Sequence, residues 1–332
     1  MGVSSNPAVG HEPYLAPRGK VGDFLARLRG GDEIAHLLTL IFAAGVILIT
    51  SLLVYELWIN SALSRHTFGW KFFVTSVWDP VFNHFGALPF LYGTVITTVV
   101  ALIIAVPLGV GAAIFLAELA PPRASDMLAF VIDLLAAVPS VIYGVLGIFV
   151  VVPFVRTALG PFLESTFGFL PLFKGPSYGL GVLTASLVLT IMIIPFIISV
   201  SREVLMAVPV DQREAALALG ATRWESTIRV VVPFASTGIA GSIFLAMARA
   251  LGETMAVTMV IGNDPRISAS LLAPGYSIAA VIANEFTEAT GALYLQALIE
   301  LGLVLFLVTF ILNGLARLLI VATEQRGGGT PA

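Results

Sequence analysis

Long apolar stretches separated by short polar segments run along most of the chain. Six of them are long enough to cross a bilayer, because an α-helix rises about 1.5 Å per residue and the hydrocarbon core is about 30 Å thick. We predict membrane spans over residues 36–59, 92–118, 128–155, 180–201, 238–262 and 293–320. The pattern is that of an all-α integral membrane protein.

The polar sequence gathers at the two ends and in one internal loop. We predict a tail at 1–33, rich in Pro, Gly, Ser and charge, a transmembrane domain at 34–322 and a second tail at 323–332. Apolar residues recur with helical spacing between Val21 and Leu28, which favours either a short helix on the membrane surface or a solvated segment.

Basic residues are distributed unequally between the two sides of the predicted spans. Eleven fall on one side and five on the other, and Arg249 falls inside a span. Because cytoplasmic loops carry the excess of Lys and Arg, we predict that both termini are cytoplasmic. The larger set is Arg18, Lys20, Arg27, Arg29, Arg123, Arg202, Arg213, Arg223, Arg229, Arg317 and Arg326, and the smaller set is Arg65, Lys71, Arg156, Lys174 and Arg266.

Composition agrees with a lipid environment and excludes several classes of function. With 58% hydrophobic and 11% charged residues, a soluble fold would expose large apolar patches. The net charge of −3 argues against a nucleic-acid binder, and the lack of cysteine excludes disulfides, thiolate metal sites and cysteine nucleophiles. The sequence has no G-x4-G-K-[ST], G-x-S-x-G or H-E-x-x-H motif. We expect no catalytic residues, no metal site and no cofactor bound by this chain.

The most polar internal segment, residues 202–233, has the pattern of helix, tight turn and helix. Asp211 and Glu214 are spaced to cap the first helix, and Gly220 is suited to end it. Thr222 and Glu225 have the spacing of a capping box at the start of the second helix. This segment is therefore predicted to be an ordered loop outside the membrane.

The same segment matches the pattern E-A-A-x3-G-x9-I-x-L-P, with valine at both positions 230 and 232 in place of Ile and Leu. It resembles the cytoplasmic loop of ABC importer permeases. The resemblance implies a coupling helix that docks on a separate ATPase subunit, which would bind the ATP and Mg²⁺. An ordinary capped loop is the alternative. The residues expected to couple are Arg213, Glu214, Ala215, Ala216, Gly220 and Arg223.

Two opposite charges lie in the fifth predicted span. Arg249 and Glu253 are separated by i, i+4, so that one continuous helix would place them on one face, close enough to pair. Arg249 could bind an oxyanion through its planar fork of donors, while Glu253 competes with the anion and Thr254 adds a hydroxyl. A structural ion pair that fixes helix packing is the alternative reading.

The third predicted span contains a second candidate for the substrate pathway. Ser140 and Tyr143 are i, i+3 neighbours after Pro139 and could both face the pathway. Alternatively, Ser140 could bond the backbone of its own helix at the proline kink, and Tyr143 could be an interfacial anchor. Pro139 predicts a kink in this span, as Pro107 and Pro195 do in two other spans. The carboxylates at 118, 133 and 300 lie near span ends, and we do not predict them as site residues.

Two motifs point to a substrate class. R-A-L-G-E-T-M-A at 249–256 and A-A-V-P-S-V-I-Y-G at 136–144 resemble the phosphate-specific permeases of ABC importers with the type I fold. The resemblance implies inward translocation of inorganic phosphate by alternating access in a bacterial plasma (inner) membrane. It also implies a related permease subunit, an ATPase dimer and an external phosphate-binding protein as partners, besides membrane lipid.

Two alternatives remain open from the sequence. Sulfate and molybdate permeases share the R-A-L-G-E core, so the chain could serve another oxyanion. A secondary transporter or channel that needs no ATP belongs to a different class, but it has no need for a docking helix of this pattern, and no internal repeat of the spans is evident.

Overall fold

The computed structural model describes residues 32–327 and divides the chain into two units, 1–56 and 57–332. In the first unit the described residues all belong to α2 (Asp32–Asn60), which ends in the second unit. None of the most apolar window of this helix is buried. A helix that is apolar on all sides is typical of a membrane span. The predicted surface helix at 21–28 lies outside the described residues, and the division into tails and one transmembrane domain stays a prediction.

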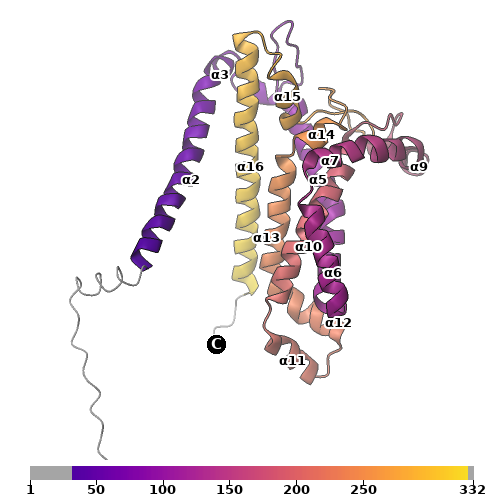
Figure 1. Ribbon diagram of the computed structural model, residues 1–332. Coiled ribbons are helices and arrows are strands. Elements are labelled where there is room, and N and C mark those ends of the chain that lie inside the picture. The colour runs from indigo at the N-terminus through magenta and orange to yellow at the C-terminus, as the bar shows by residue number, and fades with distance from the viewer. Residues whose placement is uncertain (1–31, 328–332) are drawn as a thin grey trace, which may run out of the picture. The chain divides into compact units, whose positions relative to one another are not determined.

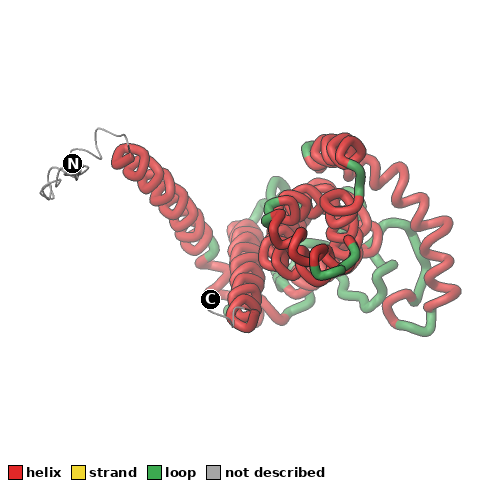
Figure 2. The backbone as a smooth tube through the Cα atoms, turned by 90° about the horizontal axis from the view of Figure 1, so that it is seen from below, coloured by secondary structure: helices red, strands yellow, loops and turns green. Residues whose placement is uncertain are grey.

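The second unit is built from helices joined by loops, and Figure 2 shows no strand in the described part of the chain. The elements are α3 (Ala62–Phe68), α4 (Lys71–Val74), α5 (Leu88–Ile114), η1 (Phe115–Leu119), α6 (Pro122–Ala136), α7 (Ser140–Leu146), η2 (Gly147–Val151), α8 (Val152–Phe154), η3 (Val155–Leu159), α9 (Gly160–Phe167), η4 (Pro171–Phe173), α10 (Val182–Met206), α11 (Val210–Ala218), α12 (Arg223–Ser226), η5 (Thr227–Val231), α13 (Val232–Leu251), α14 (Met255–Thr258), α15 (Ile278–Glu285) and α16 (Ala292–Gly327).

Six helical stretches in the described residues are long and apolar enough to cross a membrane, which confirms the predicted number. The chain is therefore a multi-pass, all-helical membrane protein. The stretches are Ala35–Asn60, Leu88–Leu119, Ser140–Phe167, Val182–Met206, Arg223–Leu251 and Ala292–Leu318.

The third predicted span, 128–155, is wrong as a single helix. The helix breaks between Ala136 and Ser140, because Pro139 lacks an N–H and adopts an extended conformation with φ −57° and ψ 139°. The stretch long enough to cross a membrane therefore starts at Ser140. Pro107 and Pro195, by contrast, lie inside the continuous helices α5 and α10.

Arg249 is not alone among basic residues in the candidate spans, contrary to the prediction. Several helices continue beyond their apolar stretches, so that arginines fall near their ends or in their later turns. The arginines that lie inside these helices besides Arg249 are Arg156, Arg202, Arg223, Arg229 and Arg317.

The core of the second unit forms where α5 packs against α10. Small residues on α5, such as Ala101 and Ala105, are fully buried and allow the backbones to approach closely. A Cβ on Gly109 would lie 2.8 Å from the Ile197 side chain, so glycine is needed at this crossing. α10 is the central helix of the unit, with 72% of its most apolar window buried.

The two ends of the second unit differ in their elements. Figure 1 shows α11 and α12 at one end and α3, α14 and α15 at the other. The helical stretch Arg223–Leu251, made of α12, η5 and α13, runs from the first end towards the second. We call these the loop end and the opposite end.

Aromatic packing consolidates the opposite end. Trp78 packs edge-on against Phe85 and Phe90, and Phe85 stacks on Tyr294 with 5.3 Å between ring centroids. The Glu285 carboxylate accepts hydrogen bonds from the Trp78 indole at 2.8 Å and the Tyr294 hydroxyl at 2.7 Å. These bonds satisfy the polar groups of the cluster and join the segment before α5 to α15 and α16.

Candidate functional site

The first helix of the loop begins differently from the prediction. α11 starts at Val210 after Pro209, and no side chain caps it, so the predicted cap by Asp211 and Glu214 is wrong. The extended backbone of Pro209, with φ −55° and ψ 138°, sets the start one position before Asp211. Asp211 lies in the first turn instead, where a negative charge favours the helix dipole.

The predicted end of this helix is confirmed. Gly220 has φ +88°, and its N–H donates to the Leu217 carbonyl at 2.9 Å. The Ala221 N–H donates to the Ala216 carbonyl at 3.2 Å. These two bonds and the left-handed glycine form a Schellman motif, which stops the helix and reverses the chain.

The predicted capping box at the second helix is also confirmed. The Glu225 N–H donates to Thr222 Oγ1 at 3.3 Å, and the Thr222 N–H donates to Glu225 Oε2 at 2.9 Å. The cap starts the helix at Arg223, and this helix continues without a break through η5 into α13. The loop is thus rigidly joined to a membrane-spanning helix.

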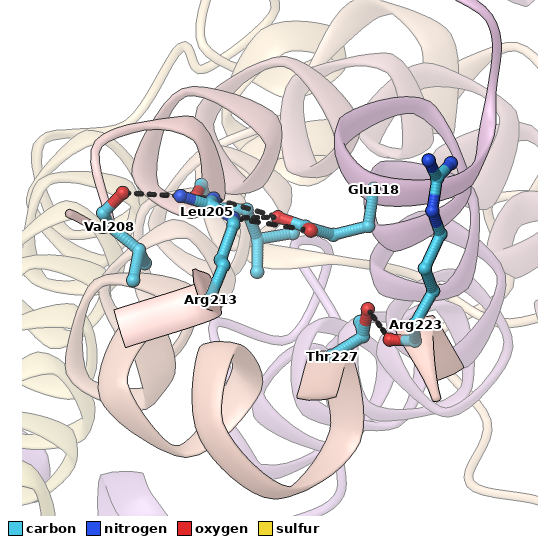
Figure 3. Close-up of polar contacts among 6 residues, drawn as sticks. All are labelled: Glu118, Leu205, Val208, Arg213, Arg223 and Thr227. Carbon is cyan, nitrogen blue, oxygen red and sulfur yellow. Dashed lines mark hydrogen bonds and ion pairs between the residues drawn. The ribbon is translucent and has the colours of Figure 1, made fainter. Parts of the chain in front are cut away.

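Arg213 fastens the loop to the membrane-spanning bundle. Its guanidinium donates to Glu118 at 2.8 Å and to the backbone carbonyls of Leu205 and Val208, as Figure 3 shows. The two charged side chains are 21% and 10% exposed. Arg213 therefore holds α11 against the ends of η1 and α10. The N–H donors of its guanidinium are used in these bonds within the chain.

Other residues of the loop face outward. Glu214 and Arg223 are exposed, and in Figure 3 the Arg223 guanidinium points away from the Arg213 network. Leu219 is 90% exposed and Trp224 is 55% exposed at the turn. Leu219 lies in the turn between the two helices, and Trp224 lies in the first turn of the stretch Arg223–Leu251, so both apolar side chains are available for contact at the loop end.

A groove of about 490 Å³ separates α11 from the following helix. Small residues line it, among them Ala215, Ala216 and Gly220, with Glu225 and Arg229 on its other wall. Side chains this small leave room for a helix or a side chain of another protein to lie close to the backbone. The structure thus brings the two alanines and the glycine of the E-A-A-x3-G pattern to one concave surface, whereas Glu214 is not part of its lining.

The predicted pairing of Arg249 with Glu253 is wrong. α13 ends at Leu251, and Glu253 and Thr254 lie in the break before α14, so the i, i+4 helical geometry does not exist. Gly252 at the end of α13, a poor helix former, accounts for the interruption. Glu253 Oε1 instead accepts a hydrogen bond from the Ala256 N–H at 3.1 Å, and the described ion pairs do not include Arg249.

The break in the fifth span lies beside the break in the third span. A Cβ on Gly144 of α7 would lie 2.6 Å from the Met259 sulfur and 3.1 Å from the Ala256 Cα, so α7 and α14 are in direct contact. Tyr143, next to Gly144, is buried and interacts electrostatically with Arg249. The two sequence motifs, 136–144 and 249–256, therefore meet at one place in the fold.

The polar residues at this junction have different environments. Arg249 is exposed in the isolated chain, while Ser140, Glu253 and Thr254 are half-buried. The Tyr143 hydroxyl donates to the Leu135 carbonyl at 2.6 Å, across the break at Pro139. This bond engages the tyrosine in holding the broken helix, a role that had not been predicted for it, and Arg249 is the accessible charged group of the junction.

The junction can bind an anion by ordinary electrostatics. The Arg249 guanidinium has five N–H donors and stays charged at any pH at which the protein is folded. α7 starts at the junction, and the N-terminus of a helix adds unpaired N–H groups and a partial positive charge. Among residues 32–327 no group of His, Asp and Glu is placed to hold a metal ion.

One residue of the site had not been predicted. Glu118 was assigned only to a span end, but it is the ion-pair partner of Arg213. The two residues are 95 positions apart in the chain, and no local pattern links residues at that separation. A carboxylate within the last turn of an apolar helix was the only available signal.

Comparisons with known proteins agree on one group. Residues 105–323 match the family described as "Binding-protein-dependent transport system inner membrane component". The chain is 46% identical to the phosphate transport system permease protein PstC of Mesorhizobium japonicum, over 90% of this chain and 92% of the relative. It is 48% identical to the protein of the same name from Xylella fastidiosa, over 78% and 81% of the two chains.

A solved structure supports the fold alone. A chain of a bacterial alginate ABC transporter, determined with a pentasaccharide-bound periplasmic protein, superposes with a TM-score of 0.56 at 15% identity. The match covers 92% of this chain and all of the other. The helical arrangement described above is therefore one that ABC transporters contain.

Proposed function

The chain belongs to the family of binding-protein-dependent transport system inner membrane components, and we propose that it carries inorganic phosphate inward as the permease subunit of an ABC importer. The observation that supports this most directly is the meeting of the two motifs at the junction of α7 and α14. Each motif interrupts a membrane helix there, and transporters commonly place their substrate sites at such interruptions.

Arg249 is the group that we propose to receive the anion. It lies in the last turn of α13, is accessible in the isolated chain, and is near enough to Tyr143 of α7 to interact with it electrostatically. The residues proposed to complete the pathway are Glu253, Thr254, Ser140 and Tyr143. Because Glu253 does not pair with Arg249 in this conformation, its competition with the anion would require a movement of the 252–254 break.

We propose that ATP hydrolysis takes place in a separate ATPase dimer that docks on the loop. The exposed Leu219 and Trp224, the groove beside Ala215 and Ala216, and the outward Glu214 supply the apolar and polar contacts for such docking. Arg213 has a different role from the one predicted, since it orients α11 from within the chain. ATP and Mg²⁺ are proposed to be bound by the ATPase.

The orientation of the chain in the membrane follows from the same proposal. With the loop on the cytoplasmic side, the eleven basic residues counted with it face the cytoplasm, as do both termini. The location is then the bacterial inner membrane. A related second permease subunit is proposed to cover the exposed side of Arg249, and an external phosphate-binding protein to deliver the anion at the opposite end.

The experiment is ATP-dependent uptake into liposomes that contain this chain purified with its associated subunits. Phosphate, sulfate and molybdate are compared, each with its binding protein. Uptake of phosphate alone is expected. Uptake of sulfate or molybdate would correct the substrate and keep the architecture, whereas uptake that needs no ATPase would refute the ABC mechanism.

Arg249→Lys tests the role of the arginine. Lysine keeps the positive charge but lacks the planar pair of N–H donors that a guanidinium presents. We therefore expect phosphate uptake to fall by about tenfold or more, which is the effect of losing a hydrogen bond to a charged group. Arg156→Lys, in another candidate span, is the matched control and should keep full uptake. Normal uptake by Arg249→Lys would assign Arg249 a structural role.

A further inference from the structure

A second cavity lies at the opposite end, away from the junction of α7 and α14. It has a volume of about 640 Å³ and is lined by the end of α3, by α4, α5 and α16, and by the last turn of α2 within the second unit. Its walls are apolar except for Arg65 and Glu300. The substrate pathway proposed above uses none of these residues.

Glu300 is a buried carboxylate with an unused oxygen. The residue is 2% exposed, and Oε2 has no hydrogen-bond partner. The Ser64 side chain lies beside this carboxyl group, and its hydroxyl is buried and has no other hydrogen-bond partner. A carboxyl oxygen without a direct hydrogen-bond partner in an apolar interior is costly, so it favours a donor that enters the cavity.

Arg65 supplies the opposite charge at the same cavity. Its guanidinium stacks on the Trp58 ring at 3.6 Å from the centroid, and its Nε donates to Ser61 Oγ at 3.0 Å. Stacking on tryptophan fixes the guanidinium plane without neutralising it. The cavity is therefore lined by a fixed cation and a buried carboxyl group, a pattern complementary to a zwitterion.

The rest of the cavity has the dimensions of an acyl chain in one leaflet. From Glu300 to Ile311 the cavity follows α16 over eleven residues, about 16 Å at 1.5 Å per residue and roughly half of a hydrocarbon core. Its sides are open, since Ile311 is 47% exposed and Trp70 is 86% exposed. Tryptophans at the head of the cavity suit the membrane interface.

We propose that this cavity binds a phospholipid whose headgroup carries a phosphate and a primary ammonium, as in phosphatidylethanolamine. Arg65 binds the phosphate, Glu300 accepts hydrogen bonds from the ammonium, and one acyl chain lies along α16. Choline lacks N–H groups and glycerol lacks the positive charge, so lipids with those headgroups satisfy only part of the site.

The test measures lipid retention by the complete transporter. The complex is reconstituted in equal mixtures of phosphatidylethanolamine, phosphatidylcholine and phosphatidylglycerol, extracted with detergent, and its bound lipids are quantified by mass spectrometry. We expect enrichment of the ethanolamine lipid in the native protein and a loss of about tenfold in Glu300→Gln, with the phosphate contact retained. Asp133→Asn, a carboxylate on α6 away from the cavity, should change nothing. Equal retention by the native protein and Glu300→Gln would refute the proposal.

A second measurement identifies the occupant even where Glu300→Gln folds poorly. The chain has no cysteine, so Ile311→Cys introduces a single labelling site inside the cavity for a photoreactive probe. An adduct with the mass of a phospholipid is expected. An adduct with a peptide of the second permease subunit, or of residues 1–56 of this chain, would overturn the assignment.

Discussion

The ion pair between Arg213 and Glu118 allows a quantitative test of how the loop is held. The pair joins α11 to the span Leu88–Leu119, with Arg213 Nη2 at 2.8 Å from Glu118 Oε1. The two side chains are 21% and 10% exposed, so solvent screens them less than it screens a surface pair. Arg213 also donates to the carbonyls of Leu205 and Val208.

We expect Glu118→Gln and Arg213→Gln each to lower the free energy of unfolding, with Arg213→Gln the more damaging, because it also deprives two backbone carbonyls of their donor. The double variant should lose less than the sum of the single losses. The difference, the coupling energy, should be about 1.5–3 kcal/mol, as for hydrogen bonds between charged groups. Unfolding in mixed detergent micelles measures all the variants.

The pair Arg202–Asp126 is the matched control. It has an N–O distance of 3.1 Å, but the Asp126 side chain is 76% exposed, so its coupling energy should stay below about 1 kcal/mol. Additive losses at positions 118 and 213 would refute the reasoning, as would equal coupling in both pairs. Glu118→Gln should also lower the number of phosphate ions taken up per ATP hydrolysed, since α11 is then less firmly attached.

Three further predictions concern a turn, a helix contact and a pH dependence. Gly220→Asn should keep coupled uptake, because asparagine tolerates the φ of +88°, whereas Gly220→Val should uncouple ATP hydrolysis from uptake in a chain that still inserts. Gly144→Ala should lower uptake, since its Cβ meets a methionine sulfur at 2.6 Å, while Gly111→Ala, with no atom within 4 Å, should be neutral or stabilising in thermal unfolding. The Arg266 guanidinium lowers the pKa of the Asp264 carboxyl below 3.8. The interaction between the two groups therefore stabilises the folded loop above pH 3.8, and this stabilisation is lost as the pH falls through the lowered pKa. Amide exchange of residues 262–275 should therefore be faster in Asp264→Asn near neutral pH, and a difference that persisted in strong acid would contradict this account.

The local signals of the sequence predicted the loop well. The Gly220 stop and the Thr222–Glu225 box form as predicted, because each depends on residues a few positions apart and on backbone hydrogen bonds that helix ends always need. The first cap failed for an equally local reason, since Pro209 fixed the start of α11 before Asp211 could cap it. Such competition between adjacent residues is difficult to judge from the sequence.

The membrane helices show what hydropathy can and cannot predict. The number of spans depends on apolar length alone and was confirmed. The breaks at Pro139 and Gly252 lie inside apolar stretches, where the hydropathy of the break does not differ from that of the helices on either side. The predicted pairing of Arg249 and Glu253 assumed an unbroken helix. The contact of α7 with α14 depends on tertiary packing at Gly144, which no single-chain pattern encodes.

The two proposed sites are joined by one continuous helical stretch. Arg249 follows Arg223 by 26 positions in an unbroken helical stretch, which corresponds to about 39 Å at 1.5 Å per residue. A helix this long moves as a nearly rigid body, so a displacement of the loop on docking an ATPase would reach Arg249 without being absorbed on the way. The break at 252–254 lies directly beyond Arg249, where the chain can bend instead. If Arg249 receives the anion as proposed, movement of α13 relative to α7 would change its surroundings, and the affinity for the anion would then depend on the position of the loop.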